Sequence, residues 1–114
     1  MANFFKGLVR ANSTNYGDLE GSMTGIKRGK MQMPICIEKG KCLAWAVGSD
    51  DVELSKDTVK SVEPIASNQI VKDITGGQGK TYNVNVYKIT MKDGQVGTLR
   101  LLSGTEYKVL QLIK

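Results

Sequence analysis

The densest group of charged side chains in this chain is the basic run Lys27-Arg28-Gly29-Lys30. Three cations beside a glycine can present both side chains and backbone N–H groups to a phosphate. Lys39 and Lys41 follow shortly after, so nearly a third of all basic residues lie in one short stretch. The candidate contacts for an anion or an anionic membrane surface are therefore Lys27, Arg28, Lys30, Lys39 and Lys41. The alternative is a solvated turn whose charges keep the protein in solution.

Two cysteines, Cys36 and Cys42, flank a turn around Glu38-Lys39-Gly40 and form a candidate thiol pair. If this turn is a three-residue loop, the cysteines lie directly opposite each other, at the ~4.5 Å Cα spacing that is the lower edge of disulfide geometry. They would then form either a strained, easily reduced disulfide or two small buried thiols, and free thiols are expected in a reducing cytosol. If the loop has two residues, the sulfur atoms lie on opposite faces and no bond can form.

Other groupings that could support catalysis or hold a metal are incomplete. The chain has no histidine, the usual proton-transfer residue, and two cysteines alone are too few ligands for zinc. The glycine-rich stretch 74–81 resembles the end of a phosphate-binding P-loop, but Ile74 stands where the first glycine belongs, and strand-forming residues follow instead of a helix. Asp50, Asp51 and Glu53 lack the spacing of a calcium loop. We therefore expect neither an enzyme, nor a cofactor, nor a metal site.

The elements that must position these residues belong to one small domain. At 114 residues the chain is long enough for a single core. Its net charge of +5 is modestly basic, and no apolar run approaches the ~20 residues of a membrane span or the pattern of a signal peptide. We expect a cytoplasmic protein, or one that contacts the inner face of a membrane. Residues 1–20 are predicted to form a peripheral N-terminal segment or arm, and residues 21–114 a single domain.

The first hairpin of this domain can be assigned by its register. A three-residue loop Glu38-Lys39-Gly40 places Met33 and Ile35 opposite Trp45 and Leu43, so that the bulky apolar side chains share one face. It also places its glycine at the left-handed position that such loops need. A two-residue loop would instead place two small alanines opposite the same residues. The sequence therefore favours the three-residue loop, with Trp45 in the core.

The second hairpin follows the same logic. A three-residue loop Lys92-Asp93-Gly94 groups the apolar residues of both strands on one face, namely Tyr87, Ile89, Met91, Leu99 and Leu101. The rival is a two-residue Asp93-Gly94 loop, which is the usual interpretation of that dipeptide but scatters the apolar residues over both faces. The three-residue loop is again favoured.

Shorter strands and a final helix complete the domain. Strands are expected at Val52 to Leu54, Val59 to Ile65 and Ile70 to Ile74. The long strand that leads into the second hairpin changes parity near Val86, which predicts one extra residue, a β-bulge, at that point. Ser103-Gly104-Thr105-Glu106 is a capping-box pattern, and the apolar spacing after it favours a C-terminal helix of about three turns over a strand. The expected fold is mainly β: a small, bent antiparallel barrel or sandwich of about seven strands with a C-terminal helix.

This order of elements resembles the pleckstrin-homology-like (PH-like) domains of bacteria. The stretches that carry the resemblance are residues 52–63, where a strand gives way to a polar step and a second strand, the hairpin from Tyr87 to Leu102, and the helical segment from Ser103 to Lys114. The resemblance implies a barrel closed at one end by the helix, and a non-catalytic binding or scaffolding module. Some members of that superfamily bind phosphorylated lipid headgroups through basic residues near the first hairpin, while others bind peptides or oligomerise.

Two functions follow as expectations. The first is a binding module whose sheet edges, hairpin loops or basic residues recruit a protein or peptide partner, an anionic membrane, or a second copy of the chain as a homo-oligomer. The second is a small basic β-barrel that binds nucleic acid, which would use the same positive charge. Barrels of that kind usually expose aromatic side chains next to cations, and aromatics are few here. A protein or membrane partner is therefore preferred over nucleic acid.

Overall fold

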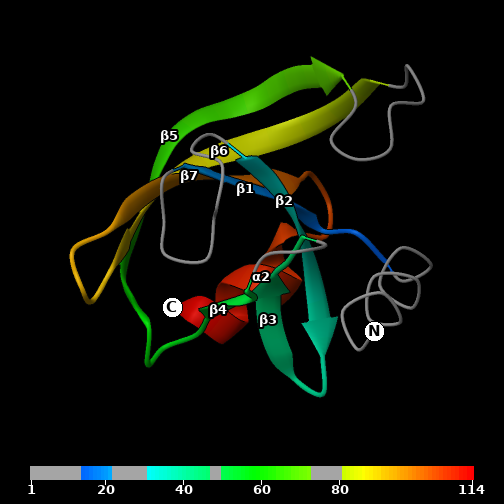
Figure 1. The fold of residues 1–114 in the computed structure, drawn as a ribbon. Coiled ribbons are helices and arrows are strands. Elements are labelled where there is room, and N and C mark those ends of the chain that lie inside the picture. The colour runs from blue at the N-terminus through cyan, green and yellow to red at the C-terminus, as the bar shows by residue number, and fades with distance from the viewer. Residues whose placement is uncertain (1–13, 22–30, 47–49, 73–80) are drawn as a thin grey trace.

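The computed structural model of this chain describes residues 14–21, 31–46, 50–72 and 81–114 (Figure 1). Within these ranges the chain forms one antiparallel sheet and one helix. The strands are β1 (Gly17–Gly21), β2 (Met31–Glu38), β3 (Lys41–Ala44), β4 (Val52–Leu54), β5 (Val59–Lys72), β6 (Thr81–Met91) and β7 (Val96–Leu102), and the helix is α2 (Glu106–Ile113). Their order across the sheet is β4-β3-β2-β1-β7-β6-β5, which leaves β4 and β5 at the two edges. The expected fold class, a bent antiparallel sheet of seven strands with a C-terminal helix, is confirmed.

The sheet curls into a half-barrel, and α2 lies inside the curve (Figure 1). The helix buries Val109 and Ile113 in this interior. The strands contribute alternate side chains to the same core, because successive side chains of a strand point to opposite faces. The largest fully buried side chains of this core are Leu19, Met33, Ile35, Leu54, Ile89, Leu99 and Leu101. The helix thus supplies the second layer that the apolar face of the sheet requires.

The N-terminal boundary of the fold differs from the expected peripheral arm. Residues 17–20 belong to β1, which is the central strand of the sheet, so the prediction that residues 1–20 are peripheral is wrong for them. β1 pairs with β2 through Leu19↔Met33 and with β7 through Leu19↔Leu99, and Leu19 is fully buried. Two glycines and two acidic residues give this short strand little β-propensity of its own, so its place depends on its two longer neighbours. Residues 1–13 of the predicted arm lie outside the described residues.

The first hairpin has a two-residue loop, and the predicted three-residue loop is wrong. β2 and β3 pair from Glu38↔Lys41 onward, which leaves Lys39 and Gly40 as the turn. Both turn residues have positive φ angles, 51° and 77°, as a type I′ turn requires. A turn of that type matches the right-handed twist of the strands it joins, and this match decides the register.

The core side of β3, the second strand of the first hairpin, is lined by small residues. Cys42 and Ala44 are fully buried there, on the strand that α2 contacts. Leu43 lies on the other face and is half-buried, and Trp45 is half-buried and outside the core, against the expectation of a core tryptophan. The helix α2 therefore packs over β3 on the face where the sequence predicted the bulky side chains of Leu43 and Trp45.

The second hairpin has the predicted three-residue loop. Tyr87 pairs with Leu99, and the N–H of Met91 donates a hydrogen bond to the carbonyl oxygen of Gln95 at 2.8 Å, which closes the loop. Gly94 has a φ of 93°, the left-handed conformation that such a loop needs. Its grouping of apolar side chains on the core face is confirmed.

The predicted β-bulge in β6 is wrong, because the extra residue opposite Val86 belongs to the neighbouring strand β5. The pairing of β6 with β7 is continuous, whereas β5 shifts register against β6 between Val59 and Ser61, between Pro64 and Ala66, and between Ala66 and Gln69. An extra residue in β6 would disturb two ladders, while in the edge strand β5 it disturbs only one. β5 is also one strand of 14 residues, where the sequence predicted two shorter strands.

The C-terminal helix is confirmed, but it has eight residues, and the predicted capping box is absent. The N-cap is Thr105, whose side chain makes no capping hydrogen bond. Glu106 is the first residue of the helix, so it cannot reach back over a turn as the glutamate of a capping box does. Its carboxylate is directed toward β6, where it accepts hydrogen bonds from Asn85 and Tyr87.

Candidate functional site

A groove of about 450 Å³ opens between the edge strand β5 and the first turn of α2. The residues that line it come from three elements: Pro64, Ile65, Ala66 and Ser67 of β5, Asn85 and Tyr87 of β6, and Glu106 of α2. The β5 side is mainly apolar, and the polar atoms come mostly from β6 and α2. No further strand of the described chain pairs with the outer edge of β5. The groove therefore lies beside an open sheet edge.

The β5 side of the groove is shaped by one of the bulges. Pro64 pairs with Tyr87 and Ala66 pairs with Val86, so Ile65 between them is an extra residue with no partner on β6. Its side chain is 59% exposed at the groove. Isoleucine is usually buried, so the bulge holds an apolar side chain in water beside a concave surface.

The polar side of the groove is a small hydrogen-bond network. Oε2 of Glu106 accepts hydrogen bonds from Nδ2 of Asn85 at 2.5 Å and from the hydroxyl of Tyr87 at 2.8 Å. Oδ1 of Asn85 in turn accepts from the backbone N–H of Asn68 at 3.1 Å. Asn68 has a φ of 53°, a conformation that asparagine tolerates better than most residues. The side chain of Asn85 thus links the irregular part of β5 to the start of α2.

Two features of this network are relevant to binding. Burial and the neighbouring Glu106 carboxylate together raise the pKa of Tyr87 to about 12, so its hydroxyl stays a hydrogen-bond donor at neutral pH. The second carboxylate oxygen of Glu106, Oε1, has no hydrogen-bond or ion-pair partner in the described part of the chain. Glu106 is half-buried and lines the groove, so this oxygen is available to a ligand.

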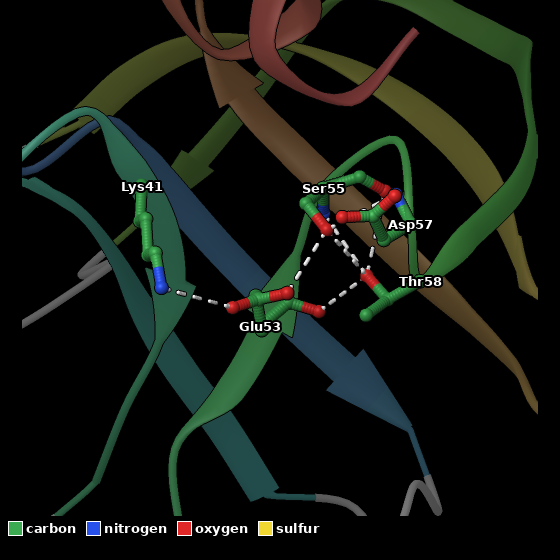
Figure 2. Close-up of polar contacts among 5 residues, drawn as sticks. All are labelled: Lys41, Glu53, Ser55, Asp57 and Thr58. Carbon is green, nitrogen blue, oxygen red and sulfur yellow. Dashed lines mark hydrogen bonds and ion pairs between the residues drawn. The ribbon is translucent and has the colours of Figure 1, made fainter.

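A smaller hollow of about 140 Å³ lies between the first hairpin, β4 and the end of α2. It is lined by Gly40, Lys41, Cys42, Glu53, Leu54, Ser55, Asp57 and Leu112. Figure 2 shows that several of its polar side chains are engaged with one another. Nζ of Lys41 lies 3.8 Å from Oε1 of Glu53, whose other oxygen accepts a hydrogen bond from the Ser55 hydroxyl at 3.0 Å.

The remaining contacts of this hollow stabilise the turn between β4 and β5. The Thr58 hydroxyl donates to the carbonyl oxygen of Glu53 at 2.8 Å and accepts from the N–H of Ser55 at 3.0 Å (Figure 2). The Ser55 hydroxyl accepts from the N–H of Asp57 at 3.2 Å. These hydroxyls hold the short polar step between two strands, which is a structural task. The groove beside β5 is therefore the better candidate for a functional site.

The structure describes only part of the predicted basic patch. Lys39 and Lys41 are both exposed on the first hairpin, and Lys41 faces Glu53 there. Lys27, Arg28 and Lys30 lie outside the described residues. Because a carboxylate stands beside Lys41, this hairpin is not uniformly positive. Binding of an anionic membrane or of nucleic acid by the basic residues stays a prediction.

The predicted thiol pair is not formed. Cys36 pairs with Leu43 and Cys42 with Ile37, so the two side chains lie on opposite faces of the hairpin and the predicted direct juxtaposition is wrong. Both cysteines are buried and neither is in a disulfide bond, which confirms the expectation of two buried thiols. Burial, with a smaller contribution from Cys36, raises the pKa of the Cys42 thiol to about 12. A thiol with so high a pKa is a poor nucleophile at neutral pH.

One buried ion pair has no counterpart among the sequence predictions. Asp18 of β1 is fully buried, and its carboxylate accepts two hydrogen bonds from the guanidinium of Arg100 on β7, one of them 2.7 Å long from Nε to Oδ1. Because its neighbour Leu19 faces the core, Asp18 lies on the opposite face of the sheet. Burial raises the pKa of Asp18 although Arg100 opposes that rise, and the hydrogen bonds with Asp18 raise the pKa of Arg100.

The sequence predictions also missed the polar side of the groove. Glu106 was assigned to a capping box and Tyr87 to the apolar face of the second hairpin, while Asn85 had no role. A signal was present in the alternation of Asn83 and Asn85 with valines, because asparagine is rare inside strands. The partner of Asn85, however, lies 21 residues further along the chain, and only the docking of α2 brings the two together.

The comparisons with known proteins add no relative. No protein-family model, no curated protein and no solved structure matches this chain. The resemblance to PH-like domains therefore stays a prediction. Within the described residues, no group of three or more metal-ligating side chains is found, and no helix is long and apolar enough to cross a membrane.

Proposed function

We propose that this protein is a non-catalytic binding module that holds an extended peptide segment of a partner protein in the groove between β5 and α2. The observation that carries the proposal is the position of Ile65, which is 59% exposed at a groove of about 450 Å³ beside an open sheet edge. Exposed apolar side chains of a protein that lie at a concave surface are typical contact points for a bound ligand.

The shape of β5 favours a short peptide contact over a long intermolecular ladder. Pro64 has no backbone N–H, and the register shifts around Ala66 interrupt the edge. Such irregularities protect an edge strand from pairing along its whole length. A ligand would therefore gain most of its affinity from side chains that enter the groove, with a few backbone hydrogen bonds beside them.

The buried cysteines support the non-catalytic part of the proposal. Neither is exposed, and the pKa of Cys42 is raised to about 12, so a thiolate is scarce at neutral pH. The polar side chains that line the groove are the hydroxyl of Ser67, the amide of Asn85, the phenol of Tyr87 and the carboxylate of Glu106. The amide and the phenol both donate hydrogen bonds to the carboxylate. This arrangement suits recognition of a ligand.

Selection from a library of displayed random nonapeptides tests the proposal. A selected peptide, made with a fluorescent label, is titrated by anisotropy against the wild-type protein, Ile65→Asp and Val96→Asp. Val96 is a matched control, because it is 48% exposed but lies on β7 and does not line the groove. Loss of the Ile65 contact should cost about 1.5–3 kcal/mol of binding free energy, which is a roughly tenfold to hundredfold weaker affinity.

The control should bind within about twofold of the wild type, and both variants should retain the wild-type unfolding temperature, since both side chains are exposed. If the library gives no binder, or if every selected peptide tolerates Ile65→Asp, the groove is not a peptide site and the proposal fails.

A further inference from the structure

We infer that the ligand of the β5–α2 groove carries a positively charged side chain, Lys or Arg, that pairs with Glu106 next to an apolar side chain that packs on Ile65. This inference rests on the proposed function and names the chemical class of the peptide: basic and apolar residues side by side. It is independent of the basic patch on the protein itself.

The carboxylate of Glu106 is held in one orientation. Its Oε2 accepts from two donors on β6, Asn85 at 2.5 Å and Tyr87 at 2.8 Å, so the group cannot rotate away without losing both. Oε1 is left without a partner in the described part of the chain. A pre-oriented acceptor loses little conformational entropy when a ligand binds, and an ionised carboxylate prefers a cationic donor.

Filling the groove would make a cation necessary. An extended peptide that covers Ile65 and Pro64 also removes water from the half-buried carboxylate of Glu106. A charged group that loses its water without gaining a partner costs binding free energy, whereas a Lys or Arg side chain on the ligand restores the interaction. The groove therefore discriminates against ligands that are apolar throughout and favours those with a basic residue.

The protein does not supply this cation from its own described residues. No lysine or arginine of the described chain forms an ion pair with Glu106. Glu106 also lies in the first turn of α2, where a negative charge stabilises the helix, so a structural role coexists with the proposed one. The experiment must therefore measure ligand preference as well as stability.

Charge exchange between protein and peptide separates the two roles. The probe is a nonapeptide from the selection above, acetylated and amidated at its ends, together with its Lys→norleucine and Lys→Glu versions. These are titrated against the wild type, Glu106→Gln and Glu106→Lys. Glu63→Gln is the matched control, because Glu63 is an exposed carboxylate on β5 that precedes the lining residue Pro64 but does not itself line the groove. The glutamine at position 106 can still accept from Asn85 and Tyr87, so that variant should fold.

We expect the wild type to bind the basic peptide at least tenfold more tightly than the norleucine version. Glu106→Gln should abolish this preference, Glu106→Lys should transfer it to the Lys→Glu peptide, and Glu63→Gln should leave it unchanged. A purely structural role of Glu106 would weaken all three peptides equally, and that result would overturn the inference.

Other outcomes decide between the inference and the proposed function. Peptides that depend on Ile65 but show no preference for a basic residue would overturn the inference and leave the groove as a peptide site. If no peptide depends on Ile65, both fail. Self-association of the wild-type chain in analytical ultracentrifugation, abolished by Glu106→Gln, would make a second copy of the chain the occupant. That result would overturn the proposed function, which assigns the ligand to a partner protein.

Discussion

The carboxylate of Asp18 and the guanidinium of Arg100 form a two-point ion pair between β1 and β7, on the face of the sheet opposite to the core. Asp18 is fully buried and the Arg100 side chain is 16% exposed. A buried pair of this kind contributes little net stability, because both charges have lost water, but removal of one partner leaves the other unpaired. The two charges are paired only when β1 is aligned with β7 in the observed register. The ion pair therefore favours that placement of the short strand β1 over others.

Arg100→Met should destabilise the protein by about 3–5 kcal/mol, because it leaves the buried Asp18 without its partner. The double variant Asp18→Leu/Arg100→Met should recover most of this loss, since it removes both charges. Urea unfolding followed by circular dichroism measures each free energy of unfolding. A double variant no more stable than Arg100→Met would contradict this account.

The stability of Arg100→Met should depend on pH in a defined direction. Burial raises the pKa of Asp18 in the folded protein above its value of 3.8 in the unfolded chain, and the loss of Arg100 removes an opposing influence. A raised pKa in the folded state stabilises the fold at low pH and ceases to do so as the pH rises. The difference in free energy of unfolding between the wild type and Arg100→Met should thus shrink as the pH falls toward 3.8. A difference that stays constant with pH would show that the charge of Asp18 is not its cause.

Gly17→Ala should be far more harmful than the same change at Gly104. Gly17 has a φ of 145°, and a Cβ atom there would lie 1.9 Å from the backbone carbonyl oxygen of Arg100. Gly104 also has a positive φ, 96°, but a Cβ there would meet nothing within 4 Å. We expect a loss of about 3 kcal/mol or more at Gly17, from strain and a backbone clash, and about 1 kcal/mol at Gly104. Thermal unfolding of the two variants measures both losses, and similar values would contradict the close approach of β1 to β7.

Tyr87 should ionise later than an ordinary tyrosine. The difference in tyrosinate absorbance between the wild type and Tyr87→Phe reports this group alone, and its pKa should be about 12 instead of 10.0. Glu106→Gln should lower that pKa, because the carboxylate is one of its causes. Because the raised pKa favours the folded state only while the phenol is protonated, the free energy of unfolding should fall between about pH 10 and pH 12. That fall should be smaller in Tyr87→Phe, and an equal fall would show that Tyr87 is not responsible.

Both cysteines should be unreactive thiols in the folded protein. Because Cys36 and Cys42 are buried on opposite faces of the hairpin, a thiol reagent such as Ellman's reagent should label neither at neutral pH, and both after unfolding in guanidinium chloride. A reducing agent should leave the unfolding temperature unchanged. A drop in that temperature on reduction would reveal a disulfide and would refute the register of the first hairpin.

The sequence by itself determined the elements whose signals are local. The loop Lys92-Asp93-Gly94 and the parity of the apolar residues on either side of it were sufficient for the register of the second hairpin. The helical spacing of apolar residues after Ser103 was sufficient to predict α2. The alternation of polar and apolar residues elsewhere was sufficient to predict a mainly β fold. In each case the residues that carry the information are close in sequence, so turn chemistry and periodicity decide the structure.

Only the tertiary structure decided which strands are neighbours and what fills the interior. β1 is central because two distant strands pair with it, and the first hairpin takes its two-residue loop with small residues toward α2. The candidate site has the same origin, since Glu106 meets Asn85 only when the helix docks inside the curled sheet. These features depend on contacts between residues far apart in the chain, and no local pattern encodes such contacts.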